Sequence, residues 1–502
     1  MRTVLTALLA ISVCSSAVPA QATPPQTATT RSFARAREVL HAAAEAHGGL
    51  EKLRSVKTVH RTGKGKIYTQ GQNLGPDAPP SARDLETDVW IDFPGTRARV
   101  ENRTRLAGNP IHTRNVLAGD SGYAWNAATN ASTRFTPTGG AGLRNTIRRD
   151  PLRVIVNALG RAETARSLGT DTHDARPHDV VSYAESDGTV ITLFLDANTH
   201  LLGKVETWAD AAVLGDTLTE QIYSDYRTVD GIKAPFRLTV RSAGQVTQEM
   251  SFSAIEPNAT PEAATFDLPA NLLEQAPAAT ATVEVTPLGP GVHLIGGGTH
   301  ASLAVEFADH VVVVDAPLSG ERTRTVLDEV KKLAPGKPVR SVVNTHYHFD
   351  HTGGLREYIA EGVTVLTHAA NAGFVKGLAT RPRGIRPDRL TGKPTDARLR
   401  TVTDKLVLSD ATQTLELHAL PNSHARGMLV AFVPKLKVLY NADLFGPPLV
   451  GPLPIGNDFT FELREGIRKL GLQVETLAPA HGRIATMADL EESIRKRPTS
   501  SK

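Results

Sequence analysis

Residues 344–354 read Asn-Thr-His-Tyr-His-Phe-Asp-His-Thr-Gly-Gly, and this stretch decides the kind of fold to expect. Residues 339–344, which lead into it, contain three valines, as is typical of a strand. Side chains two apart on an extended segment project to the same side, so His346 and His348 can reach one ion. Asp350 and His351 follow on the turn into a helix and approach the same opening from another angle. Three histidines and one aspartate in six residues predict a metal site.

Further residues with ligand chemistry lie on both sides of this stretch, at the ends of other apolar runs. Asp315 closes Val311–Val314, and His424 precedes a second apolar run at 429–433. Asp443 follows a third run at 438–440, and His481 lies in Pro-Ala-His-Gly near the C-terminus. Strands alternate with helical patterns over this region, which predicts an α/β sandwich.

The pattern His-x-His-x-Asp-His after an apolar strand resembles the signature of the metallo-β-lactamase superfamily. The resemblance covers about 285–490 and implies an αβ/βα sandwich, which we place at 284–495. It implies that His346, His348 and His424 bind one metal ion. It further implies that Asp350, His351 and His481 bind a second ion, that Asp443 bridges the two, and that Asp315 is mainly structural.

Neutral imidazoles with few carboxylates suit Zn²⁺, and we expect two ions per chain, with Fe or Mn as alternatives. Two ions about 3.5–4 Å apart share a water and make hydroxide available at neutral pH. We therefore expect an enzyme, a metal-dependent hydrolase of an ester-like bond: a thioester, lactone, phosphodiester or sulfate ester. Asp350 is the expected catalytic residue, orienting the nucleophile and passing its proton to the leaving group.

Asp443 stands where dedicated β-lactamases of the superfamily generally carry Cys or Ser, which disfavours a β-lactam substrate. Two other hypotheses stay open at this point. One is a mononuclear-iron persulfide dioxygenase of the same fold. The other is a carrier of an apolar ligand with a regulatory metal domain.

Residues 31–272 show alternating strand patterns and a helical pattern at 32–46, which predict an antiparallel β-rich domain. The helical pattern runs into Gly-Gly-Leu-Glu-Lys-Leu at 48–53, and Asp-Gly-Ile-Lys-Ala-Pro-Phe follows at 230–236. This half resembles the lipoprotein-carrier half-barrels of bacterial envelopes, which implies an α+β antiparallel half-barrel with an apolar ligand. Its seven histidines are scattered without a metal-ligand spacing, and we interpret them as surface or capping residues.

The first twenty residues carry Arg2, an apolar stretch and Val-Pro-Ala, the layout of a secretory signal peptide. We expect a periplasmic or secreted protein, with linkers at 21–30 and 273–283. The one cysteine, Cys14, lies inside the signal segment, and the sequence leaves its lipidation open. No later run reaches the 18 apolar residues of a transmembrane helix.

Lys and Arg number 56 against 52 Asp and Glu, too small an excess to indicate a nucleic-acid partner. The segment from Lys376 to Arg400 is different, with eight basic and two acidic residues. It is interpreted either as a solvated loop or as a positive patch beside the mouth of the site, which would attract an anionic small-molecule substrate or lipid headgroups.

Overall fold

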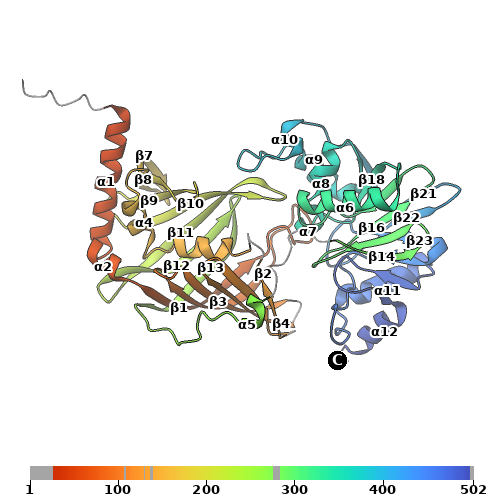
Figure 1. Ribbon diagram of the computed structural model, residues 1–502, viewed down its shortest axis with the longest axis horizontal. Coiled ribbons are helices and arrows are strands. Elements are labelled where there is room, and N and C mark those ends of the chain that lie inside the picture. Colours follow the sequence, from red (N-terminus) through yellow and green to blue (C-terminus); the bar gives the residue numbers. More distant parts are fainter. Residues whose placement is uncertain (1–26, 107–108, 129, 136–138, 275–282, 498–502) are drawn as a thin grey trace, which may run out of the picture.

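The computed structural model describes residues 27–106, 109–128, 130–135, 139–274 and 283–497. The expected signal peptide and most of the linker at 273–283 lie outside these residues. The chain forms two bodies side by side, an N-terminal sheet domain and a C-terminal domain of sheets and helices (Figure 1). No helix in the described ranges combines the length and apolarity needed to cross a membrane.

The N-terminal domain is built on one 13-stranded sheet whose neighbouring strands are antiparallel. Two meanders, β1 to β6 and β7 to β13, join where β1 pairs with β13. The strands are β1 Thr58–Tyr68, β2 Ala82–Asp92, β3 Arg97–Leu106, β4 Asn109–Ala118, β5 Ser121–Asn126, β6 Ala131–Arg134, β7 Arg166–His173, β8 Arg176–Ala184, β9 Val190–Asp196, β10 Leu202–Ala211, β11 Gly215–Val229, β12 Ile232–Ser242 and β13 Gln245–Pro257. The predicted antiparallel β-rich domain is confirmed, whereas its half-barrel form stays a prediction.

Local turn chemistry explains part of this sheet. Asp187-Gly188 connects β8 to β9, with Tyr183 paired to Ile191, and Asp-Gly is a dipeptide typical of hairpin turns. Gly188 has φ +84°, a backbone conformation that residues with a side chain rarely adopt.

Short helices accompany the sheet: α1 Ala28–Ala46, α2 Leu50–Ser55, α3 Ala141–Arg148, α4 Val154–Gly160 and α5 Ala270–Leu273. Helix α1 begins four residues before the expected Ser32, so residues 28–30 of the expected linker are helical. The side chain of Thr27 caps this helix by accepting a hydrogen bond from the Thr30 amide. A capping threonine within the expected linker therefore sets the start of the helix, and the Pro/Thr-rich composition of that linker did not indicate a helix.

The C-terminal domain contains two sheets, one of seven strands in the order β14 to β20 and one of six strands in the order β21 to β26. The first sheet comprises β14 Glu284–Gly289, β15 Val292–Gly296, β16 Ser302–Glu306, β17 Val311–Val314, β18 Val339–Asn344, β19 Thr364–His368 and β20 Leu399–Val402. The second comprises β21 Lys405–Ser409, β22 Thr414–Ala419, β23 Leu429–Val433, β24 Val438–Tyr440, β25 Thr476–Ala478 and β26 Ala485–Thr486. Several of these bounds, such as those of β17, β18 and β23, equal the predicted ones.

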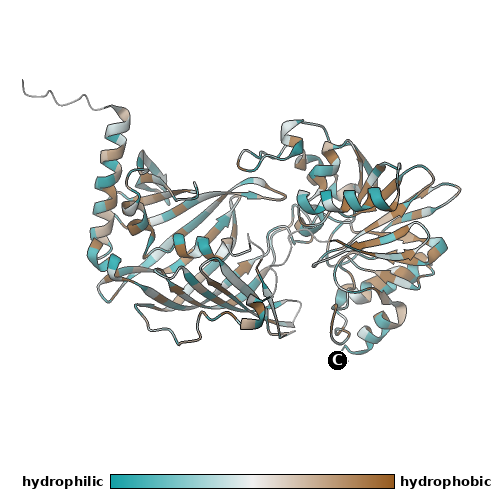
Figure 2. Cartoon of the chain, viewed as in Figure 1, coloured by the Kyte–Doolittle hydropathy of each residue, from teal (hydrophilic) through white to brown (hydrophobic). Residues whose placement is uncertain are grey.

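Helices cover the outer faces of both sheets. They are α6 Gly320–Leu333, α7 Phe349–Thr352, α8 Leu355–Ala360, α9 Ala372–Leu378, α10 Arg389–Gly392, α11 Asp458–Leu470 and α12 Met487–Arg495, with short 3-10 turns η1 Ala369–Asn371 and η2 Pro434–Leu436. Hydrophobic residues concentrate on the strands of this domain (Figure 2).

Strand β17 shows how the layers form. All four of its valines are buried, Val312 and Val314 in the core between the sheets and Val311 and Val313 under helices α6 and α8. An unbroken apolar run is what a strand covered on both faces requires. The domain is therefore a sandwich of helix, sheet, sheet and helix layers, as predicted.

The two domains touch at the segment rich in basic residues. Arg383 is buried and donates to Asp210 at 2.7 Å and to the carbonyl of Ala211 at 3.0 Å, both in the N-terminal domain. Asp216 accepts from the backbone amides of Gly384 and Ile385. Part of the basic segment is therefore a contact between domains, which neither interpretation from the sequence foresaw.

Candidate metal centre

The candidate ligands lie on loops at one edge of the sandwich, each just after a strand. His346 and His348 follow β18, and Asp350 and His351 lie on the four-residue helix α7. His424 lies between β22 and β23, Asp443 follows β24 and His481 follows β25. Strands β17 and β18 are parallel, as are β24 and β25, so their carboxyl ends carry these loops to the same edge.

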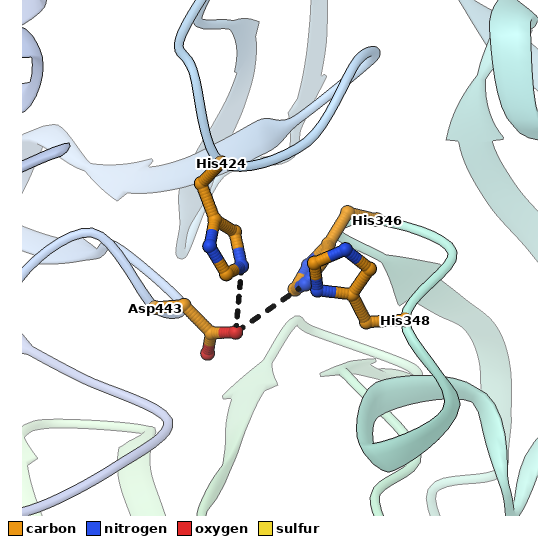
Figure 3. A group of neighbouring side chains, drawn as sticks. All are labelled: His346, His348, His424 and Asp443. Atoms are coloured by element: carbon orange, nitrogen blue, oxygen red, sulfur yellow. Dashed lines mark hydrogen bonds and ion pairs between the residues drawn. The ribbon is translucent and has the colours of Figure 1, made fainter. Parts of the chain in front are cut away.

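The structure brings all seven predicted ligands together in two groups that share Asp443. The ligand atoms of the first group, His346, His348, His424 and Asp443, lie within 4.8 Å of one another (Figure 3). The same limit holds for the second group, which is Asp350, His351, Asp443 and His481. Among the described residues these are the groups of three or more His, Cys, Asp or Glu side chains arranged to hold an ion.

Asp443 faces the two groups with different oxygens. Its Oδ2 lies 3.0 Å from Nε2 of His424 and 3.4 Å from Nε2 of His346. Its Oδ1 lies 2.8 Å from Nε2 of His351 and 3.1 Å from Nε2 of His481. Ligands of a tetrahedral zinc ion at about 2.0–2.1 Å are separated by about 3.4 Å, so these spacings are close to those of a ligand shell.

Buried polar atoms that lack hydrogen bonds indicate whether these residues suit metal ions. Nε2 of His346, Nδ1 of His348, Nε2 of His351 and Oδ1 of Asp443 are buried without a well-formed hydrogen bond, and apart from Nδ1 of His348 they face other predicted ligands as ion-pair contacts. Leaving a polar atom buried and unpaired costs about 1–3 kcal/mol. Four such atoms directed at one small volume fit a site built for cations.

The opposite nitrogens of these histidines are held by neighbours. Nδ1 of His351 lies 2.9 Å from Oδ2 of Asp315, which is fully buried after β17. Asp315 also accepts from the backbone amide and the hydroxyl of Thr345, each at 2.9 Å, and from the hydroxyl of Tyr440 at 3.1 Å. A carboxylate on the far nitrogen fixes the tautomer and orientation of a ligating imidazole. Asp315 thus has the structural role that the resemblance implies.

Electrostatics divides the histidines into two kinds. Burial, helped by the charges of neighbouring histidines, lowers the pKa of His346 well below its ordinary value and that of His348 to about 4. Burial has the same tendency at His481 and His351, but the neighbouring carboxylates outweigh it, raising the pKa of His481 to about 9 and that of His351 well above normal. His346 and His348 are therefore neutral with a free lone pair.

The two carboxylates are ionised. Burial opposes the charge of Asp350, but hydrogen bonds from His300 and His481 outweigh it and hold its pKa far below the usual range. Asp443 behaves similarly, with His351 as its first stabilising neighbour. The centre thus combines ionised carboxylates with the neutral imidazoles of His346 and His348, whereas His351 and His481 would release a proton on binding a divalent cation.

His300 also lies beside the centre, although it is not among the predicted ligands. It lies on the loop between β15 and β16, and its Nε2 is 3.2 Å from Oδ2 of Asp350. Its ring is 4.1 Å from the ring of His481. The preceding glycine run, Gly296–Gly298, marked this loop, but only folding places it beside the second group. His368, by contrast, caps the 3-10 turn η1, where its Nδ1 accepts from the Ala370 amide.

Comparison with known proteins agrees with this geometry. Residues 295–481 match the model of the metallo-beta-lactamase superfamily. This segment is a metallo-beta-lactamase superfamily domain. The match covers the part of the chain that contains all seven predicted ligands, while the N-terminal sheet lies outside it.

Curated relatives of the chain include a demethylase subunit and two alkylsulfatases. The alpha subunit of 2,4-dinitroanisole O-demethylase from Nocardioides sp. (strain JS1661) is 26% identical over 198 residues, 39% of this chain and 56% of the relative. Linear primary-alkylsulfatases are 33% identical, from Pseudomonas sp. (strain ATCC 19151), and 40% identical, from Pseudomonas sp., each over 57 residues. Those residues are 11% of this chain, and 11% and 8% of the two alkylsulfatases. The chain thus spans about half of the first relative and a small part of the others.

Solved structures similar to the metallo-beta-lactamase domain include a metallo-beta-lactamase from Pontibacter korlensis, 20% identical, with a TM-score of 0.34, covering 43% of this chain and 98% of that one. Another, from Hirschia baltica, is 18% identical, with a TM-score of 0.33, and covers 43% of this chain and 99% of that one.

Proposed function

We propose that the protein is a dinuclear metal hydrolase that cleaves an ester-like bond: a thioester, lactone, phosphodiester or sulfate ester. The observation that carries this proposal is the carboxylate of Asp443, whose two oxygens face two separate groups of ligands. A mononuclear site would need only one such group. The geometry therefore favours the hydrolase over a mononuclear-iron dioxygenase.

Zn²⁺ is the proposed ion, because imidazole nitrogens dominate the first group and the second combines imidazoles with carboxylates. Fe and Mn accept the same donor types and stay as alternatives. When bound, two such ions supply hydroxide at neutral pH and polarise the bond to be cleaved.

Asp350 is proposed as the residue that moves the proton. Its carboxylate is about a quarter exposed, unlike the fully buried rings of His346 and His351. Its Oδ2 lies among His300, His351 and His481, at 3.2 to 3.7 Å from their nitrogens. An ionised carboxylate that reaches both the ligand groups and solvent can orient a water, accept its proton and pass it to a leaving group.

A cavity beside the second ligand group is the proposed entrance for the substrate. It has a volume of about 380 Å³ and is lined by the 296–301 loop, Leu449, Ala480 and Gly482. Leu449 is 67% exposed, and its neighbour Val450 is 86% exposed. Exposed apolar side chains at the cavity suit an apolar group of the ester, and Arg483, which also lines the cavity, suits an anionic one. Because two relatives are named alkylsulfatases, alkyl sulfate esters come first among the substrates to test.

The deciding experiment uses the full-length protein. Metal content is measured by mass spectrometry, and turnover is measured on β-lactam, lactone, thioester, phosphodiester and sulfate-ester substrates before and after chelation. We expect two ions per chain and turnover of at least one ester-like substrate that chelation abolishes and Zn²⁺ restores. One iron per chain, or turnover that survives complete removal of metal, would contradict the proposal.

We also propose that the N-terminal domain binds an apolar ligand. A cavity of about 200 Å³ against its sheet is lined by apolar side chains that include Val89, Leu238, Met250 and Phe252, with Arg149 and Gln221 among its polar residues. Organic extraction of the purified protein followed by mass spectrometry would find a stoichiometric apolar compound. An extract without one, from protein that also fails to bind fatty acids, would refute this part.

Export to the periplasm or the medium is proposed from the first twenty residues, which have the layout of a signal peptide. N-terminal sequencing of the mature protein from cell fractions checks this directly. A cytoplasmic protein that retains Met1 would contradict it.

A further inference from the structure

The connection between β1 and β2, residues 69–81, leaves the N-terminal sheet and reaches the metal centre (Figure 1). Its backbone bonds to the metallo-beta-lactamase domain at two places. The carbonyl of Gly71 accepts from the Phe349 amide at 3.2 Å, and the carbonyl of Leu74 accepts from the Arg426 amide at 2.5 Å. This 69–81 loop therefore bridges the segment carrying the first histidines and the segment carrying His424.

The carbonyl of Asn73 contacts a predicted ligand directly. It accepts from Nε2 of His348 at 2.8 Å and from the hydroxyl of Tyr347 at 2.7 Å. With the hydrogen held on Nε2, the lone pair of His348 is on Nδ1, which is the buried atom without a partner. The side-chain amide of Asn73 donates to the carbonyl of Ala78 at 2.8 Å, which holds the loop in this conformation.

The neighbouring residue, Gln72, contacts the second ligand group. Its side-chain amide donates to Oδ1 of Asp350 at 2.5 Å. The other oxygen, Oδ2, is thereby left facing His300 and His481. One loop residue thus decides which oxygen of Asp350 faces the second group.

Gly71 is what lets the loop approach this closely. A Cβ atom at this position would lie 2.4 Å from the ring of Phe349, and the residue has φ +72°. Both the space and the backbone conformation exclude other residues without displacement of the loop.

From these contacts we infer that the 69–81 loop is a positioning element of the metal centre. Gln72 orients Asp350 for the second ion, and the carbonyl of Asn73 fixes the tautomer of His348 for the first. The sheet domain is then part of the metal site and not an independent carrier joined to it. The inference rests on the proposed metal centre, but it concerns metal affinity and is tested without a substrate.

The test compares two glutamines of the same loop in the full-length protein. Gln72→Ala removes the bond to Asp350, whereas Gln70→Ala removes bonds only to Ser242 and Gln245 of the N-terminal domain. Binding of Zn²⁺ is measured by competition with a chelator, and the environment of each ion is followed by absorption after loading with Co²⁺. We expect Gln72→Ala to lower the affinity for the second ion by about 10–100-fold, because losing a hydrogen bond to a metal ligand typically lowers metal affinity by this factor. Gln70→Ala should match the wild type in both measurements.

A second variant tests the first ion. Gly71→Val should displace the loop and with it the Asn73 carbonyl, weakening the ion held by His348 and changing its Co²⁺ spectrum. Circular dichroism and thermal unfolding of the metal-free proteins show whether both variants fold. Folded variants that bind both ions with wild-type affinity and spectra would overturn the inference. A wild type that binds two ions but cleaves no ester-like substrate would instead refute the proposed hydrolase alone.

Discussion

Buried histidines of the sheet domain and of the metallo-beta-lactamase domain differ in what their ring nitrogens contact. His47 lies fully buried at the end of α1, and both its nitrogens have backbone partners, the carbonyl of Ala43 at 2.7 Å and the amide of Leu202 at 3.4 Å. His346 is equally buried, but its Nε2 makes no hydrogen bond and faces only another predicted ligand, Asp443, at 3.4 Å. The comparison teaches that burial alone does not mark a metal ligand. Unpaired nitrogens that converge on one point do.

The structure also qualifies the interpretation of the N-terminal histidines as surface or capping residues. His47 caps the end of α1, as that interpretation allows, whereas His178 is fully buried within the sheet domain. His60 lies between Asp88 and Glu256 and stacks on Trp90 at 4.1 Å. In the described part of this domain no three His, Cys, Asp or Glu side chains turn their ligand atoms towards one point, and Asp88 and Glu256 contact opposite nitrogens of His60.

The largest expected effect is loss of a ligand. His348→Ala or Asp443→Ala should lower turnover by about 10³-fold or more, because several kcal/mol of transition-state stabilisation depend on the ions. Metal content and kcat are measured together, with circular dichroism to verify folding. Wild-type turnover in either variant would contradict the dinuclear mechanism.

A smaller effect is expected at Asp315, which orients a ligand without being one. Asp315→Asn keeps the shape of the side chain but removes the charge facing Nδ1 of His351. Affinity for the second ion should fall by about 10–100-fold, measured by chelator competition. If the affinities for the two ions fell equally, the assignment of His351 to the second group would be wrong.

Acid should destabilise the sheet domain through His47. Burial lowers its pKa from 6.5 to about 4, so the unfolded chain binds the proton more tightly than the folded one. The stabilisation is complete above pH 6.5 and is lost as the pH falls towards 4, by about 2 kcal/mol between pH 7 and pH 5.

Urea unfolding followed by tryptophan fluorescence measures this loss, because all three tryptophans, Trp90, Trp125 and Trp208, lie in this domain. His47→Gln cannot titrate and serves as the control. A variant with the same pH dependence as the wild type would show that other groups cause it.

The smallest effect is expected where a histidine has partners of its own and no ion to bind. His60→Ala should leave metal content and kcat unchanged and lower stability by about 0.5–1.5 kcal/mol through the lost stacking on Trp90. A change in metal content would contradict the distinction between the two sets of histidines.

Much of the fold and of the centre followed from local patterns. The valine run 311–314 and the residues of β18 and β23 are apolar enough to be recognised as buried strands, and each candidate ligand follows such a strand closely. Helix α1 was placed with an error of four residues at its start, because Thr27 caps it from within a Pro/Thr-rich segment. Patterns of this kind depend on neighbours along the chain, which the sequence displays directly.

The sequence by itself determined the seven residues whose chemistry suits metal ions and the layered fold that carries them. The tertiary structure decided what holds those residues in place. Gln72 lies 278 residues before Asp350, and Asn73 lies 275 before His348. His300 joins the centre through a loop whose glycines indicate only a turn. The contacts of Gln72 and Asn73 arise from the docking of one domain on another, and that of His300 arises from folding within the metallo-beta-lactamase domain. Both depend on surfaces that form only on folding and leave no periodic signal in the chain.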